Sequence, residues 1–266
     1  MSHPQADTYL NTALGAAAEA VELQRSYFDS VEASYKAPQD IVTRADVESE
    51  RIIRSYVADR HPDHGFVGEE EGGSDEAENT WIVDPIDGTT NFYHGVPHYA
   101  VSIALKRAGD LHAGVVHHVP TDTVYAALRG DGAYCDGRRI SVSEEPDLQR
   151  SLFCTGFVPG RAVDDLTLDA LRNIVSRTHG IRRLGTAATA LSFVAQGRFE
   201  GYYHADLHRW DIAAGALLVT EAGGTVTRID ANADSREHVI ASNGPVHDSL
   251  SELVRESFGG DMERDR

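Results

Sequence analysis

The sequence is poor in cysteine and has no long apolar run. Only Cys135 and Cys154 occur among the 266 residues, and neither belongs to a His/Cys pattern typical of zinc sites. We therefore interpret both as reduced structural thiols rather than metal ligands or disulfide partners. No apolar run approaches the roughly 20 residues that span a bilayer, and the N-terminus has no apolar signal segment. These absences predict a soluble, cytoplasmic protein without a membrane partner.

Basic residues are also scarce. The chain has 42 Asp and Glu against 24 Lys and Arg, a formal net charge of −18, and its only lysines are Lys36 and Lys106. Such a charge repels nucleic acid, so we expect no nucleic-acid partner. High-GC codon usage explains scarce lysine alone. Adaptation to a salt-rich cytoplasm explains both the scarce lysine and the acidic excess, and we favour that interpretation.

Histidine is frequent, but its distribution does not indicate a metal site. Five of the 13 histidines lie on expected strands or turns without a shared ligand spacing: His94, His98, His112, His117 and His118. A histidine-bound zinc or copper centre is therefore not expected.

Residues 81–92 carry the densest chemical pattern of the chain. The run Trp81–Val83 has the β-branched and aromatic content of a buried strand. Asp84 and Asp87 follow three positions apart, and Gly88 permits a sharp bend into a helix. Amides at a helix N-terminus favour an anion. Carboxylates for a divalent cation beside a phosphate-sized anion site are what metal-assisted phosphoryl chemistry requires.

The order of predicted elements divides the chain into two halves. Helices are expected from about Thr8 to Glu32 and from Ala45 to Arg60, with a break at Lys36–Pro38, and antiparallel strands follow residue 99. Residues 72–79 are expected to form a polar loop. The acidic, proline-containing segment 141–148 is the best boundary, and strands alternate with helices after it. We predict an N-terminal α+β domain over residues 1–145 and a C-terminal α/β domain over residues 146–266.

Acidic residues recur at the ends of four predicted elements. Two begin helices and two groups follow strands: Asp46, Asp211, Glu69 with Glu70, and Asp84 with Asp87. Mg²⁺ prefers about six oxygen ligands at roughly 2.1 Å and usually retains waters, so a few carboxylates and a carbonyl suffice. Two ions roughly 3.5–4 Å apart need a bridging carboxylate. Asp84 is the candidate for the bridge, because Asp87 can reach one ion and the carbonyl of Ile86 the other.

Taken together, these motifs resemble the inositol monophosphatase family within the lithium-sensitive, magnesium-dependent phosphatases. The resemblance covers nearly the whole chain and rests on G-E-E at 68–70, D-P-I-D-G-T-T-N-F at 84–92, G-T-A-A at 185–188 and W-D-I-A-A-G at 210–215. It implies a layered αβαβα sandwich, of the inositol monophosphatase and fructose-1,6-bisphosphatase type, with the site between its halves. It also implies two or three Mg²⁺ ions, sensitivity to lithium and a homodimer.

The resemblance further implies roles for individual residues. Glu69, Asp84, Ile86, Asp87 and Asp211 occupy the positions of the family's metal ligands. Glu69, Thr89 and Asp46 occupy those of the residues that activate water. The amides of Gly88 and Thr89 correspond to those that bind phosphate, and Lys36 and Glu70 correspond to supporting residues. Asp87, Thr186, Ala187 and Asp211 correspond to residues on the substrate side.

One departure from the family pattern concerns the substrate side. Inositol phosphatases typically have a glutamate a few residues before W-D, whereas this chain has His204. His204 is either a contact for sugar or polyol hydroxyls or a partly exposed histidine without a special role. Arg182 and Arg183 are either a site for a second phosphate or a solvated strand end.

The sequence thus predicts a Mg²⁺-dependent phosphate monoester hydrolase, with inositol 1-phosphate as the leading substrate and metal-activated water attacking in line. No phosphoenzyme is expected, because no Ser, Cys or His nucleophile is required. The enzyme alternatives are phosphatases of fructose 1,6-bisphosphate, histidinol phosphate or a nucleotide 3′-phosphate. A catalytically silent phosphate-binding regulator is the alternative of another class. Such proteins usually lose a metal carboxylate, and none of the expected ones is missing here.

The salt-adapted interpretation predicts that activity and unfolding temperature are maintained or raised as KCl approaches molar concentration, because salt screens repulsion among the surface carboxylates. Phosphate release and thermal unfolding along a KCl series measure this. Activity that is greatest in dilute buffer and falls steadily with KCl would contradict it.

Overall fold

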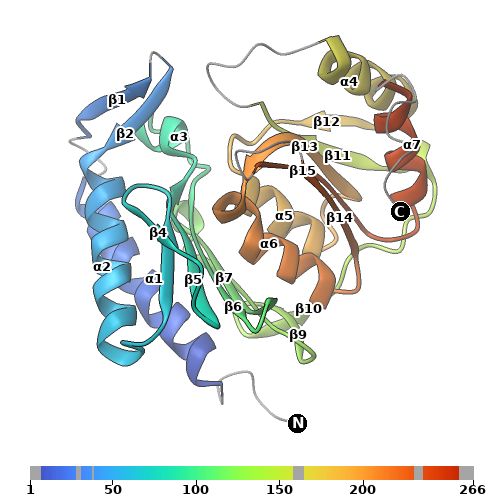
Figure 1. Ribbon diagram of the computed structural model, residues 1–266. Coiled ribbons are helices and arrows are strands. Elements are labelled where there is room, and N and C mark those ends of the chain that lie inside the picture. Colours follow the sequence, from blue (N-terminus) through green and yellow to red (C-terminus); the bar gives the residue numbers. More distant parts are fainter. Residues whose placement is uncertain (1–6, 28–30, 38, 158–164, 231–235, 258–266) are drawn as a thin grey trace.

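The computed structural model describes residues 7–27, 31–37, 39–157, 165–230 and 236–257. Five alternating layers of helix and sheet lie side by side (Figure 1). Helices α1 (Thr8–Tyr27) and α2 (Arg44–Arg60) form one outer layer, and α4 (Asp165–Arg177) and α7 (His247–Ser257) form the other. The expected αβαβα sandwich is confirmed.

The first sheet has eight strands in the order β10-β9-β8-β7-β6-β5-β3-β4. Only the pair β3 and β5 is parallel, and the other neighbours are antiparallel. The strands are β3 (Gly65–Gly68), β4 (Gly72–Ser74), β5 (Asn79–Asp87), β6 (Ala100–Arg107), β7 (Asp110–His118), β8 (Thr123–Leu128), β9 (Gly132–Cys135) and β10 (Arg138–Ile140). Strand β5 is buried along almost its whole length, as expected of a strand with helices on both faces of its sheet.

The second sheet has five strands in the order β12-β11-β13-β15-β14. Strand β11 runs parallel to both of its neighbours, and β15 runs antiparallel to both of its own. The strands are β11 (Leu152–Thr155), β12 (Gly180–Arg182), β13 (Gly201–His208), β14 (Thr225–Asp230) and β15 (Arg236–Ser242). Strands and helices alternate in the C-terminal half as predicted, up to β14 and β15, which follow each other with no helix between them among the described residues.

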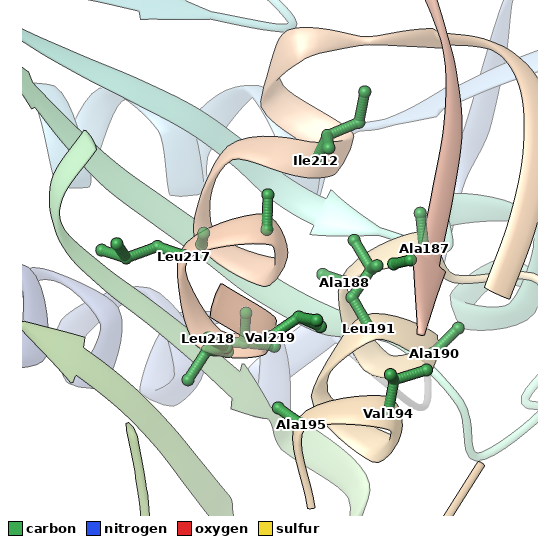
Figure 2. Close-up of a cluster of buried hydrophobic side chains, with 14 of the residues drawn as sticks. Ala187, Ala188, Ala190, Leu191, Val194, Ala195, Ile212, Leu217, Leu218 and Val219 are labelled. Carbon is green, nitrogen blue, oxygen red and sulfur yellow. The ribbon is translucent and has the colours of Figure 1, made fainter. Parts of the chain in front are cut away.

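Helices α5 (Ala187–Ala195) and α6 (Arg209–Glu221) fill the space between the two sheets. Residues 212–219 of α6 are all buried, which is typical of a helix covered on every side. Figure 2 shows side chains of the two helices, including Leu191 and Leu217, gathered in one cluster. The cluster also contains Val116 and Tyr125 from the first sheet and Ala241 from the second. The hydrophobic core thus includes residues from both halves, and the division at residue 145 stays a prediction.

Three small elements differ from the expectations. The first helix has ended before Lys36, as predicted, but the strand β1 (Ala33–Ala37) was not predicted, and it pairs with β2 (Asp40–Thr43) in a separate two-stranded ribbon (Figure 1). The residues expected as a polar loop include β4, which pairs with the edge of the first sheet. Strand β10 was also not predicted. These strands are short and mostly exposed, so they lack the apolar alternation from which a strand is recognised.

The first helix also ends earlier than expected, at Tyr27, and residues 28–30 lie outside the described part. The second helix and the strands at 65–68, 123–128 and 132–135 are confirmed. Within the described residues, no helix has the length and apolar content needed to cross a membrane.

We expect substitutions in the central layer, between α5 and α6, to lower the free energy of unfolding most. Leu191→Ala removes a fully buried side chain between α5 and α6, so we expect a loss of about 2–5 kcal/mol in the free energy of unfolding. Urea denaturation monitored by circular dichroism measures it. Leu168→Ala, at a position 46% exposed on α4, is the matched control and should change stability by no more than about 0.5 kcal/mol.

Candidate active site

A cleft of about 790 Å³ is lined by residues of both halves of the chain. Its lining includes the β1–β2 ribbon, the end of β5, the N-termini of α5 and α6, and strand β13. Most of the predicted site residues border it: Lys36, Glu69, Asp87, Thr186, Ala187, His204 and Asp211.

Three carboxylates meet beside this cleft. Asp84 and Asp87 come from β5 and Asp211 from the first turn of α6, and each offers an oxygen within 4.8 Å of the other two. In a regular strand, residues three apart point to opposite faces. Here the register slips, since Asp84 pairs with Ser102 but Asp87 with Ala100. This β-bulge turns both aspartates toward one site.

The cluster has the properties of a cation site. Asp84 is buried, and its Oδ1 has no hydrogen-bond partner in the structure. Burial, and after it repulsion from Glu69, Asp87 and Asp211, raises the pKa of Asp84 well above its usual range. Divalent cations with a preference for oxygen, such as Mg²⁺, would relieve both the repulsion and the missing bond. The donor set therefore fits Mg²⁺.

Asp87 is fixed by the N-terminus of α5. Its Oδ2 accepts hydrogen bonds from the Thr186 hydroxyl (2.5 Å) and the Ala188 amide (2.6 Å), and its Oδ1 accepts from the Ala187 amide (3.2 Å). Burial raises the pKa of Asp87 to about 6 against the lowering effect of these bonds. Thr186 and Ala187 were predicted only for the substrate side. Their contacts with a carboxylate 99 and 100 residues away were not predicted.

Thr89 and Asp46 form a second part of the site. The Thr89 hydroxyl donates to Asp46 Oδ1 (2.9 Å) and lies 3.1 Å from the carbonyl oxygen of Ile86. The other oxygen of Asp46 accepts from the amide of Thr43 at 2.8 Å and from its hydroxyl. Burial raises the pKa of Asp46 to about 6 despite these bonds. The predicted link between Asp46 and Thr89 is thus present as a direct hydrogen bond.

Gly88 makes the turn between β5 and the short helix α3 (Thr89–Tyr93). Its φ of +102° lies in the left-handed region, and a Cβ there would lie 3.0 Å from the carbonyl oxygen of His98. Both observations require glycine at this position.

Lys36 brings the only positive charge of the β1–β2 ribbon's described residues to the site. Its ammonium lies 3.2 Å from Glu69 Oε1 and 2.7 Å from Glu70 Oε1. Burial lowers the pKa of Lys36, but Glu69 and Glu70 outweigh it and raise the value above its usual range. Burial, and then the charge of Glu69, raises the pKa of Glu70 to about 7. Glu69 is not one of the three carboxylates whose oxygens lie within 4.8 Å of one another, but its charge raises the pKa of Asp84 more than that of Asp87 or Asp211 does.

Comparison with known proteins shows the family of this chain. The model of the inositol monophosphatase family matches residues 5–258. The chain belongs to this family. It is 40% identical over 232 residues to the inositol-1-monophosphatase of Rhizobium meliloti, covering 85% of this chain and 87% of that protein. It is 39% identical over 268 residues to the Nus factor SuhB of Pseudomonas aeruginosa, covering 96% and 98%.

A solved relative has the same fold. The crystal structure of the extragenic suppressor protein SuhB from Bartonella henselae superposes with a TM-score of 0.88, at 37% identity over 94% of this chain and 99% of that one. Membership of the inositol monophosphatase family identifies the protein as a phosphoric monoester hydrolase.

Within this member of the inositol monophosphatase family, His204 is buried rather than partly exposed. Its Nδ1 lies 2.7 Å from the Ala205 carbonyl oxygen, and burial lowers its pKa to about 4. The neutral ring therefore carries its proton on Nδ1, which leaves Nε2 as an acceptor. Of the two arginines considered for a second phosphate, Arg183 lines the cleft and Arg182 does not.

The residue that sequence reasoning missed is Glu50, on α2. Its side chain is fully buried, and its carboxylate accepts hydrogen bonds from the amides of Glu70 (2.7 Å) and Glu71 (3.0 Å). The available signal was its position four residues after Asp46, which places both on one face of the helix.

The cluster predicts a stabilising effect of Mg²⁺. At about 100 times its dissociation constant, one bound ion stabilises the folded protein by roughly 2.7 kcal/mol. Asp84→Asn should abolish most of this gain, yet leave the metal-free protein as stable as before or more so, because it removes one of the repelling charges. Thermal unfolding in EDTA and in MgCl₂ measures both effects.

Asp59→Asn, at an exposed position of α2, is the control and should respond to Mg²⁺ as the unaltered protein does. If Asp84→Asn retained the full Mg²⁺ stabilisation, the aspartate cluster would not be the metal site.

Proposed function

We propose that this phosphatase hydrolyses small polyol or sugar phosphates with Mg²⁺, and that inositol 1-phosphate is its leading substrate. The observation that carries the proposal is the buried Asp84 oxygen without a hydrogen-bond partner, among carboxylates beside a cleft. Such an arrangement is costly without a cation.

In this proposal Glu69, Asp84 and the Ile86 carbonyl would hold Mg²⁺ at one position. Asp84, Asp87 and Asp211 would hold it at a second. When bound, Mg²⁺ neutralises charge on the phosphate and makes water easier to deprotonate. The amides of Gly88 and Thr89 contact the phosphate, and Lys36 and Glu70 support the position of Glu69.

Glu69 and Thr89 orient the attacking water. The Thr89 hydroxyl is directed at Asp46 and the Ile86 carbonyl, so its lone pairs are left to accept a proton from the water. The water then attacks phosphorus in line with the departing alcohol, without a phosphoenzyme. Asp211 faces the leaving group.

The substrate side supports a hydroxyl-bearing leaving group. His204 offers an acceptor nitrogen to the cleft, which suits the O–H groups of a polyol, and Arg183 offers positive charge. A second phosphate near Arg183 favours fructose 1,6-bisphosphate as the alternative substrate. Lithium inhibition, a homodimer and function in a salt-rich cytoplasm complete the proposal.

Phosphate release with and without Mg²⁺ tests the function. We expect hydrolysis only with Mg²⁺, and a loss of at least about 100-fold for Asp84→Asn, on the scale seen when one electrostatic contact to a reacting group is removed. Asp59→Asn should keep the full rate. Mg²⁺ binding without hydrolysis of any substrate would favour the silent phosphate-binding regulator.

The same assay separates the substrates. Initial rates on inositol 1-phosphate, fructose 1,6-bisphosphate, histidinol phosphate and adenosine 3′,5′-bisphosphate should be highest for the first. If the rate were higher on fructose 1,6-bisphosphate, and Arg183→Gln lowered that rate selectively, fructose 1,6-bisphosphate would replace inositol 1-phosphate as the proposed substrate. Trapping a covalent phosphoryl-protein adduct during turnover would refute direct attack by water.

A further inference from the structure

We infer that Glu50 is a positioning residue that fixes Glu69 relative to Asp84 and Thr89, and so sets the affinity of the site for Mg²⁺. The inference rests on the proposed function. On one face of α2, two buried carboxylates, Asp46 and Glu50, lie one helical turn apart. Asp46 holds Thr89 by a hydrogen bond, whereas Glu50 points to a different segment.

That segment is the turn after β3, and Glu50 binds its backbone. The two oxygens of the carboxylate accept separately, Oε2 from the amide of Glu70 and Oε1 from the amide of Glu71. The preceding amide, that of Glu69, donates to the carbonyl oxygen of Val83 in β5 at 3.2 Å. Three successive amides are therefore held, one by the strand that carries Asp84 and two by the helix that carries Asp46.

Gly68 makes this contact possible. A Cβ at residue 68 would lie 2.2 Å from the carboxyl carbon of Glu50 and 2.3–2.4 Å from its oxygens. The carboxylate therefore occupies the space that any other side chain would fill. The turn and the helix approach each other at this point only because residue 68 is a glycine.

A buried charge is by itself weak evidence of a stabilising role. Glu50 is fully buried, and among the described residues its ionic partner is Arg54, whose guanidinium lies 2.9 Å from Oε1 and whose side chain is 31% exposed. Buried ion pairs can often be replaced by apolar residues at little cost in stability. What a carboxylate provides, and an apolar side chain does not, is two acceptors directed at adjacent amides. Groups that orient metal ligands in this way typically change metal affinity or activity 10- to 100-fold when they are altered.

Glu50→Gln tests the inference with little change in size. The glutamine oxygen takes the place of only one of the two carboxylate oxygens, and its NH₂ group would face the other N–H. We expect the Mg²⁺ dissociation constant, measured by titration calorimetry without substrate, to rise about 10- to 100-fold. The Mg²⁺ concentration for half-maximal rate should rise in parallel, and KM for the phosphate ester at saturating Mg²⁺ should change less than kcat.

Glu48→Gln is the matched control. Glu48 lies on the same helix but bonds to Tyr27 and Arg44, away from the turn. The Glu48→Gln substitution should leave Mg²⁺ affinity unchanged. A Glu50→Gln protein that folds and binds Mg²⁺ within twofold of the Glu48→Gln protein would overturn the inference.

Gly68→Ala is a second variant that keeps every charge. The added methyl group displaces the end of the Glu50 side chain, so the same loss of Mg²⁺ affinity is expected, and adding Glu50→Gln to it should cost little more. If neither single variant folded, Glu50 would be a stability residue and the inference would fail. If the unaltered protein neither bound Mg²⁺ nor released phosphate, the proposed function would be wrong instead.

Discussion

Mutual repulsion among buried carboxylates is the constraint on which the site depends. Asp84 and Asp87 are buried and Asp211 is half-buried where the three converge, so water screens their charges less than it would at an exposed surface. The protein opposes this repulsion locally. The N-terminus of α5 binds Asp87, and the amide of His208, at the start of α6, donates to Asp211 at 2.8 Å. Asp84, by contrast, has one oxygen without a hydrogen-bond partner. Two helix N-termini thus direct positive dipole ends at one cluster, and the Asp84 oxygen without a hydrogen-bond partner is where a cation would bind.

The layered fold explains how residues so distant in sequence reach this cluster. Strand β5 supplies two aspartates at its end, and α6 supplies the third because it lies between the two sheets. Helix α2, from the outer layer, adds Asp46 and Glu50 on one face. Three layers therefore contribute differently to the site. The sheet supplies two of the aspartates, the outer helix α2 supplies carboxylates that hold neighbouring groups in place, and the central helix α6 supplies the third aspartate.

Much of this could be predicted from the sequence, and the exceptions share a cause. The apolar run before Asp84 identified β5, and the acidic residues at the ends of predicted elements included the three aspartates that the structure brings together. The β-bulge that turns Asp84 and Asp87 to one side was not predictable, because it depends on pairing with Ser102 and Ala100 across the sheet. Glu50 was missed because an acidic residue in a charged helix looks solvated until the packing of Gly68 is known. Thr186 was placed near the site, but its bond to Asp87 depends on how α5 docks. Local patterns identify residue types and elements, whereas tertiary contacts decide which atoms meet.

The burial of α6 on every side has a consequence for how the enzyme becomes competent. Neither sheet alone holds all three aspartates in place, because Asp211 is on α6, and α6 packs against both sheets. Activity should therefore appear only once the two halves of the core have packed together during folding. A partial opening that exposes α6 should abolish activity before the outer helices unfold. Turnover would then serve as a sensitive reporter of global integrity rather than of one local region.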